Sequence, residues 1–286
     1  MDAELKQLSP RQFPALLREI PDPPEQVYVR GKLPSNDLKW LAVVGSRAVT
    51  PYGRQVCDHL IEGLRGYPIV IVSGLAYGVD ALAHKAALSA GLPCVGVPGS
   101  GLDWDVLYPR ANVTLAKEIL KSNGALLSEY EPDQRAADWT FPQRNRIMAG
   151  LSHATLMIEA KEKSGSLITA KLTTEYNRDL LVVPGSIFSD ASRGTHQFLK
   201  LGATPITEPG DILRALRIEA RESASADSRA DLSDPERRVL QLIASPISRD
   251  QLVAALAIPI TEVNVLLSTM EIKGLIIEEL GNIRIV

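Results

Sequence analysis

The chain has 286 residues, 45% of them hydrophobic and 23% charged, which is ordinary for a globular protein with one large domain and a small one. Its formal net charge of −3 argues against a broad basic surface for nucleic acid and leaves room only for a local basic pocket. No segment reaches the roughly 18 uninterrupted apolar residues of a membrane span, and the first residues lack the apolar core of a secretion signal. We therefore expect a cytoplasmic protein with no membrane contact.

Residues 1–40 hold a short helical pattern and the proline-rich stretch PDPPEQVYVRGKLP, and we expect them to pack on the main domain as an extension. From residue 41 to 216, apolar runs alternate with helical patterns. The runs are apolar on both sides, as in a parallel sheet covered by helices on each face, so we predict a doubly wound Rossmann-like α/β domain. The expected strands are 41–45, 69–74, 93–99, 125–129, 155–160, 180–185 and about 203–206, and the expected helices are about 52–65, 79–90, 112–122, 143–151 and 166–177.

Residues 217–231 contain few large apolar side chains and are typical of a linker. In residues 232–286, Ser233 and Glu236 have the spacing of a capping box. Helices are expected at about 234–244, 248–256 and 261–273, followed by a two-stranded hairpin that turns at Gly281-Asn282. Three helices followed by a hairpin predict a small C-terminal winged-helix domain.

Two cysteines, Cys57 and Cys94, stand in a helical and a strand pattern. Their separation gives neither a metal-binding spacing nor a disulfide framework. We interpret them as small buried hydrophobic residues in a reducing compartment, and we expect no metal and no cofactor.

Glycine-rich turns follow several of the predicted strands. In a doubly wound sheet, ligands bind at the carboxyl ends of the strands. A glycine-rich turn at a helix start lets backbone N–H groups face an anion, although a tight turn needs glycine for backbone reasons alone. Convergence of several turns with Arg47 and Lys171 favours a phosphate site. The turns are Gly45-Ser46-Arg47, Ser73-Gly74, Gly99-Ser100-Gly101 and Ser164-Gly165-Ser166.

The segment Phe141-Pro142-Gln143-Arg144-Asn145-Arg146 places an aromatic ring beside two cations and an amide at the start of a helix. Bases stack on aromatic rings, and Arg binds phosphate, so this composition is typical of a single-strand site. The alternative is an exposed helix start with a buried Phe141. Residues 139–178 contain six cations and three acids, so positive charge is concentrated around the candidate pocket.

These motifs, with Gly78-Val79-Asp80, PGSGLDWDVLYPRAN, FPQRNRIMAGLS, EAKEKSGSLITA and VVPG, occur in the order found in the DNA-processing protein A (DprA/Smf) family. The chain resembles that family over about residues 13–215, and its tail resembles the family's C-terminal winged helix. The resemblance implies a nonenzymatic protein that binds single-stranded DNA in a basic pocket. It also implies a homodimer that hands the strand to the RecA recombinase during natural transformation.

By position, the resemblance implies DNA contacts from three parts of the Rossmann-like domain. Two departures from the family pattern are Asn177-Arg178 in place of Gly-Arg and Gly194-Thr195-His196 in place of Gly-x-Asn, so no contact is carried over to 194–196. The residues implied are Gly45, Ser46, Arg47, Ser73, Gly74, Phe141, Arg144, Asn145, Arg146, Ser164, Gly165, Ser166, Thr169 and Lys171.

Other functions remain as alternatives. Asp80, His84 and Asp103 are better explained as capping or packed residues than as catalytic groups. A nucleotide-processing hydrolase of the phosphoribohydrolase type resembles this fold, but its P-G-G-x-G-T-x-x-E loop has no counterpart at Pro184-Gly185-Ser186-Ile187. A third hypothesis is an adaptor whose pocket binds nothing, and absence of DNA binding would identify it.

The predicted winged helix does not have the charge of a duplex reader. Residues 232–286 contain five cations and seven acids, and Lys273 is the single cation of the expected recognition helix TEVNVLLSTMEIK. Groove readers usually carry several Arg, Lys, Asn or Gln on that helix. We therefore expect this module to contact protein rather than DNA.

Overall fold

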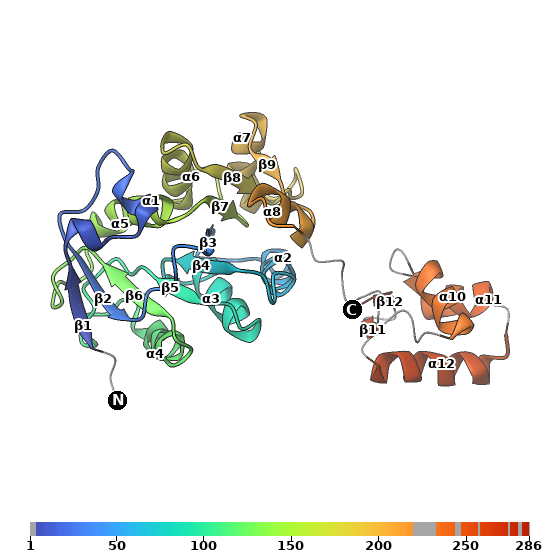
Figure 1. The fold of residues 1–286 in the computed structure, drawn as a ribbon. Helices are drawn as coiled ribbons and strands as arrows, with labels where there is room; N and C mark the ends of the chain where they lie inside the picture. Colours follow the sequence, from blue (N-terminus) through green and yellow to red (C-terminus); the bar gives the residue numbers. More distant parts are fainter. Residues whose placement is uncertain are drawn as a thin grey trace. The chain divides into compact units, whose positions relative to one another are not determined.

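Apolar strands and amphipathic helices alternate through the first of two structural units, Met1–Glu219, and build one nine-stranded sheet (Figure 1). The structure is a computed structural model in which residues 4–219, 233–243, 247–256, 258–273, 275–279 and 282–285 are described. Most of the linker predicted at 217–231, and positions 280 and 281 of the predicted hairpin turn, lie outside the described residues.

The strands of the first unit are β1 (Leu5–Leu8), β2 (Val27–Gly31), β3 (Lys39–Val44), β4 (Ile69–Ser73), β5 (Cys94–Gly96), β6 (Ala125–Ser128), β7 (Ala154–Met157), β8 (Asp179–Val182) and β9 (Thr204–Pro205). Their order in the sheet is β1-β2-β6-β5-β4-β3-β7-β8-β9. All neighbouring strands from β6 to β9 are parallel. The prediction of a doubly wound Rossmann-like domain is confirmed.

The helices cover both faces of this sheet. They are α1 (Ala15–Arg18), α2 (Pro51–Glu62), α3 (Val79–Ser89), α4 (Val113–Lys121), α5 (Thr140–Leu151), α6 (Ser166–Glu175), α7 (Arg193–Lys200) and α8 (Pro209–Ala215), with short 3-10 turns at Pro10–Gln12, Arg110–Asn112 and Asp190–Ser192. Successive side chains of a strand point to opposite faces. In β3, Leu41 and Val43 pack with α2, α3, α4 and α8, whereas Ala42 and Val44 pack with α1, α5, α6 and α7. Each face therefore has its own apolar core.

The N-terminal segment adds an antiparallel edge to the parallel sheet. β2 pairs with β6, and β1 pairs with the outer side of β2. Arg146 of α5 holds the loop before β2, because it donates a hydrogen bond to the carbonyl of Asp22 at 2.7 Å and forms ion pairs with Asp22 and Glu129. The sequence pattern predicted neither these two strands nor α7 and α8.

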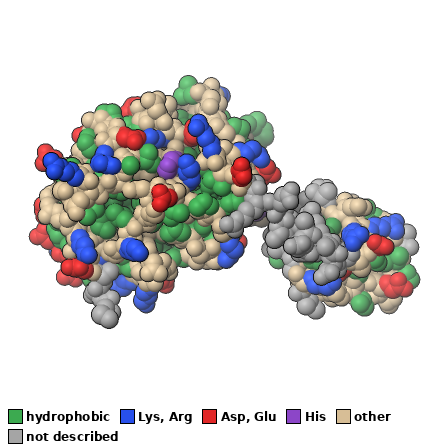
Figure 2. All heavy atoms as spheres, in the orientation of Figure 1, with side chains coloured by type: hydrophobic (Ala, Val, Ile, Leu, Met, Phe, Trp, Pro, Cys, Tyr) green, Lys and Arg blue, Asp and Glu red, His purple; other side chains and the backbone are tan. Residues whose placement is uncertain are grey.

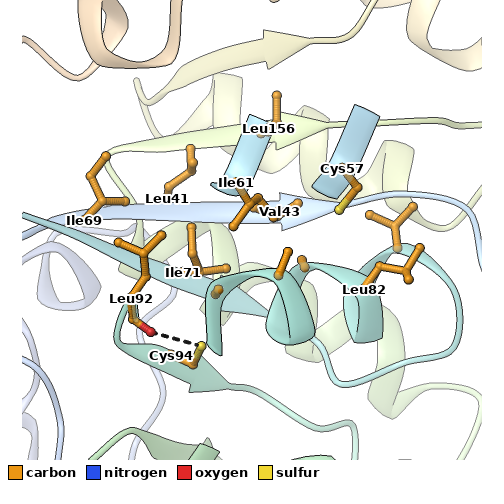
Figure 3. Close-up of a cluster of buried hydrophobic side chains, with 14 of the residues drawn as sticks. Leu41, Val43, Cys57, Ile61, Ile69, Ile71, Leu82, Leu92, Cys94 and Leu156 are labelled. Carbon is orange, nitrogen blue, oxygen red and sulfur yellow. Dashed lines mark hydrogen bonds between the residues drawn. The ribbon is translucent and has the colours of Figure 1, made fainter. Parts of the chain in front are cut away.

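The two cysteines belong to the apolar core around β3 and β4 (Figure 3). Cys57 points inward from α2, Cys94 lies on β5, and both thiols are buried and unpaired. Burial raises the pKa of each thiol to about 12, because the thiolate would lose its hydration. Both cysteines are packing residues, as their positions in apolar patterns predicted.

The second unit, Ala220–Val286, contains helices and a small sheet. Its helices are α10 (Asp234–Leu242), α11 (Arg249–Leu256) and α12 (Ile260–Ile272), and its strands are β10 (Ile247–Ser248), β11 (Ile276–Glu279) and β12 (Asn282–Ile285). The strands form a sheet in the order β10-β12-β11. Ser233 and Glu236 form the predicted capping box at the start of α10. Val263, Leu267 and Met270 of α12 are buried in the core of this winged helix.

No single helix in the described part of the chain is long and apolar enough to cross a membrane. By length and composition alone, Arg249–Leu256 and Ile260–Glu271 pass that test as a pair bent by 117°. Within the same residues, no cluster of three or more His, Cys, Asp or Glu side chains could hold a metal ion.

Candidate functional site

A pocket of the first unit lies where the winding of the sheet reverses. From β3 the chain winds in one direction through β4, β5 and β6, and then returns to the other side of β3 as β7. Ligands of doubly wound sheets bind at this reversal, outside the carboxyl ends of the strands. A pocket of about 580 Å³ opens there. We call it the switch pocket. Its lining residues are Val44, Gly45, Ser46, Arg47, Ala48, Ala76, Asp80, Asp138, Phe141, Pro142, Arg144, Asn145, Met148, Lys161, Lys163, Ser164, Gly165, Ser166, Ile168 and Thr169.

The turn after β3 supplies the first wall of the switch pocket. Gly45 lies so close to α3 that a Cβ there would be 2.6 Å from a methyl group of Val79. The hydroxyl of Ser46 donates to the carbonyl of Ala48 at 2.9 Å and accepts from its N–H at 3.1 Å, which fixes the turn. The exposed Arg47 guanidinium lies 5.0 Å from the centre of the Phe141 ring. This turn therefore places a cation over an aromatic face.

The turn between β7 and α6 supplies the opposite wall. The hydroxyl oxygens of Ser164 and Ser166 are 2.7 Å apart at the start of α6, and the side-chain amide of Asn145 donates to the carbonyl of Gly165 at 3.3 Å. Lys161 and Lys163 are exposed beside them. A helix N-terminus carries partial positive charge, so its dipole and both lysines favour an anion at this wall.

Thr169 lies one turn further along α6. Thr169 lines the switch pocket, and its hydroxyl oxygen is buried without a hydrogen-bond partner in the structure. A buried hydroxyl without a partner is costly to desolvate.

Arg144 is buried at the base of the switch pocket and connects two strands. Its guanidinium donates hydrogen bonds to the carbonyls of Gly74, at 2.6 Å, and Val97, at the carboxyl ends of β4 and β5. A Cβ at Gly74 would overlap this guanidinium, which explains the glycine. Burial lowers the pKa of Arg144, and the nearby Asp80 carboxylate opposes that shift.

Asp80 lies on the first turn of α3 and is buried in the same region. Burial raises the pKa of its carboxyl group, while Arg144 and hydrogen bonds from Ala76 and Ser73 act in the opposite direction. Asp80 therefore balances the Arg144 charge inside the protein. Both side chains line the switch pocket.

Ten of the fourteen residues predicted to contact DNA line the switch pocket, and four do not. Ser73 is buried beneath it and donates to the carbonyl of Val43 at 2.6 Å, and Gly74 contributes only a carbonyl that Arg144 occupies. Arg146 points to the N-terminal segment. Lys171 lines a second pocket of about 420 Å³, together with Arg178 and other residues of α6, β8, α7 and β9.

Several lining residues were missed by the sequence prediction. Lys161 and Lys163 stand in the quoted motif EAKEKSGSLITA but were not assigned, although two lysines before a glycine-rich turn are a usable signal. Asp138 precedes the aromatic segment and is exposed at the pocket. The lining thus has four cations, Arg47, Arg144, Lys161 and Lys163, and two acids, Asp80 and Asp138.

Outside the pocket, the face drawn in Figure 2 shows cations and acids dispersed over the surface. On the face drawn in Figure 2, Lys and Arg side chains alternate with Asp and Glu side chains and form no continuous basic surface. This agrees with the net charge of −3.

Of the three groups considered for catalysis, Asp80 lines the switch pocket, His84 is buried away from it, and Asp103 forms an ion pair with Arg30 at 3.6 Å. Glu159 is buried and accepts hydrogen bonds from the N–H, at 3.0 Å, and hydroxyl, at 2.5 Å, of Thr50, the residue that caps α2. His84 is buried, and burial lowers its pKa to about 4. The described lining of the switch pocket contains no His, Cys or Glu side chain. Its chemistry is that of an anion and ring-binding site.

Comparison with known proteins identifies the family. Residues 5–217 match the model of DNA recombination-mediator protein A, and residues 223–282 match that of the DprA winged helix domain. DNA processing protein DprA of Bacillus subtilis is 39% identical over 211 residues, covering 73% of this chain and 70% of its own. Protein Smf of Escherichia coli is 36% identical over 270 residues, covering 92% and 72%.

Two solved structures are similar to the first unit. DNA processing protein A from Streptococcus pneumoniae superposes with a TM-score of 0.68 at 38% identity, covering 76% of each chain. The protein of that name from Helicobacter pylori, described for its single-stranded DNA binding mode, gives 0.66 at 30% identity and covers 76% of this chain and 98% of its own. The chain belongs to the DNA recombination-mediator protein A (DprA/Smf) family.

Proposed function

We propose that this protein binds single-stranded DNA in the switch pocket and loads the RecA recombinase onto that strand during recombination and natural transformation. The observation that carries the proposal is the pairing of Arg47 with the Phe141 ring opposite the α6 N-terminus. One wall offers an aromatic face for a base, and the other offers cations and a helix dipole for a phosphate. The single-stranded DNA binding of the Helicobacter pylori relative supports the same class of ligand.

Within the pocket we assign the phosphate to the turn Ser164–Ser166 with Lys161 and Lys163, and the base to Phe141. Arg47 neutralises a phosphate on the side of the ring. Arg144 acts as a positioning residue, because its hydrogen bonds go to the protein's own carbonyls. A pocket of about 580 Å³ admits an unpaired base and its backbone, and a base in a duplex cannot reach Phe141 without leaving its stack.

The partners follow from the same site. A protein that holds unpaired DNA and mediates recombination, as the family name states, requires a recombinase that assembles on single strands, and RecA has that chemistry. We also propose a homodimer. Phe188 and Ile187 are 91% and 75% exposed in the loop after β8, and such an apolar pair favours burial in an interface.

We assign no catalytic activity and no cofactor to the protein and place it in the cytoplasm. We assign DNA binding to residues 41–216, on which the extension 1–40 packs. We assign protein contact to the winged helix at 232–286, which follows the linker 217–231. The phosphoribohydrolase alternative requires a glutamate at the reacting ribose, and the acids of the pocket lining are Asp80 and Asp138. Incubation with nucleoside monophosphates is therefore expected to release no free base.

The test is a fluorescence anisotropy titration of a labelled single strand and of the matching duplex. Single strands are expected to bind more tightly, with a shallow salt dependence, because the pocket contacts only a few phosphates. Equal affinity for both forms at moderate salt would contradict a single-strand site.

A further inference from the structure

The exposed Tyr108 continues the aromatic surface of Phe141 beyond the switch pocket, and a second exposed tyrosine, Tyr77, lies on a segment that contacts the pocket's first wall. The ring centres of Tyr108 and Phe141 are 5.6 Å apart, with the rings inclined by 55°. Tyr108 is 39% exposed and Tyr77 is 45% exposed, although neither lines the pocket itself. We call Phe141, Tyr108 and Tyr77 the aromatic rim.

The rim tyrosines belong to segments that are fixed to the pocket and to each other. The N–H of Tyr108 donates to the hydroxyl of Ser100 at 3.2 Å. Asn112 follows Tyr108 by four residues. Its side-chain amide donates to the carbonyls of Leu75, at 2.7 Å, and Ala76, at 3.1 Å, which directly precede Tyr77. The Tyr108 and Tyr77 segments therefore meet at Asn112.

The Tyr77 segment also meets the Arg47 turn. The N–H of Val79 donates to the carbonyl of Ser46 at 3.1 Å. Gly78, which lies between Tyr77 and Val79, has a φ of 75°. A Cβ on Gly78 would lie 2.5 Å from the carbonyl oxygen of Arg47. Tyr77 is thus held on a backbone that packs against the pocket's first wall.

Resting on the proposed function, we propose that a bound strand leaves the switch pocket across the aromatic rim, with one base on Phe141 and the neighbouring bases on Tyr108 and Tyr77. Every base has a π-face, so a series of rings extends a single-strand site without reading sequence. Another exposed tyrosine, Tyr52 on α2, does not line the switch pocket, and its hydroxyl donates to the carbonyl of Pro184 after β8 at 2.7 Å. That tyrosine provides a matched control.

The experiment uses the full chain and two labelled 12-mers, dT12 and a 12-mer that keeps a single central base and is abasic elsewhere. Both have the same phosphates, but only dT12 offers neighbouring bases to Tyr108 and Tyr77 once one base occupies Phe141. Tyr108→Ala and Tyr77→Ala are each expected to weaken dT12 binding about fivefold or more and to leave the largely abasic strand within about twofold. Tyr108→Phe, which keeps the ring, and Tyr52→Ala, which removes an exposed ring outside the rim, are expected to bind dT12 like the wild type.

Each outcome decides between the rim and the pocket. If both rim variants bind dT12 like the wild type, or if Tyr52→Ala is the variant that weakens it, the proposed path is wrong and the pocket stands. If Tyr108→Ala weakens both strands equally, Tyr108 supports Phe141 instead of stacking a base, and Tyr77→Ala alone then decides the path. If the wild type binds neither strand, the proposed function itself fails.

Discussion

Arg47 and Arg144 lie in the same pocket but differ in what their guanidinium groups contact. Arg144 is buried, and its hydrogen bonds to the carbonyls of Gly74 and Val97 hold β4 and β5 at a fixed separation. Arg47 is exposed, has no salt bridge in the described structure, and lies over Phe141. A cation whose donors are free can bind phosphate, whereas one whose donors serve the backbone positions the site.

The Phe141 ring either stacks a base or belongs to the core, because it touches both the pocket and the loop after β5. A Cβ at Gly99 would lie 2.6 Å from the ring, so part of Phe141 is packed, while its other contacts are Arg47 and Tyr108. Phe141→Ala is expected to weaken single-strand binding by about 1–3 kcal/mol with little change in salt dependence, since a stacked base is lost and no phosphate contact is. Anisotropy titrations at several salt concentrations measure both quantities.

Thermal unfolding of the same variant is the control. If Phe141→Ala lowers the melting temperature and leaves DNA affinity unchanged, the ring belongs to the core and the stacking assignment is wrong.

At the scale of the element, α5 serves two sides of the molecule. Phe141, Arg144 and Asn145 line the switch pocket, while Arg146 forms ion pairs with Asp22 and Glu129 beside the N-terminal segment. Arg144 and Arg146 are two positions apart, which is about 200° around a helix, so they cannot share a face. The sequence motif identified the helix. The helical period could have shown that these two arginines lie on different sides of it.

The predictability of the other elements has similar physical limits. The apolar strands β3 to β8 and the helices between them were predictable because a parallel sheet covered on both faces needs continuous apolar runs. β1 and β2 were not, because β2 is defined by its pairing with β6, about a hundred residues away, and the edge strand β1 is defined by its pairing with β2. Lys171 was assigned by its place in a motif, but the side of α6 on which it lies leads to the second pocket.

For the whole molecule, the distribution of charge matters more than the net charge of −3. In the second unit, Arg249 forms an ion pair with Glu278 and also donates to the Asn264 side chain of α12 at 3.0 Å. Lys273 forms an ion pair with Glu236 at 2.7 Å. The cations best placed near the recognition helix are therefore engaged within the winged helix itself.

Deletion of residues 232–286 is accordingly expected to keep single-strand affinity within about tenfold, or ~1.4 kcal/mol. The measurement uses an oligonucleotide too short for two pockets, so that avidity in a dimer does not contribute. Circular dichroism confirms that the truncated domain is folded. A collapse of binding by the folded domain would mean that the acidic winged helix contacts DNA.

The most direct test of the central claim, that single-stranded DNA binds in the switch pocket, compares Arg47→Ala with Lys171→Ala. Both changes remove one exposed cation from the same unit, but Arg47 lines the switch pocket and Lys171 lines the second pocket. The measurement is single-strand affinity as a function of salt. Arg47→Ala is expected to weaken binding to all sequences and to reduce the salt slope by about one, while Lys171→Ala is expected to leave both nearly unchanged. The reverse result, with Lys171→Ala the damaging change, would place the strand in the second pocket and contradict binding in the switch pocket.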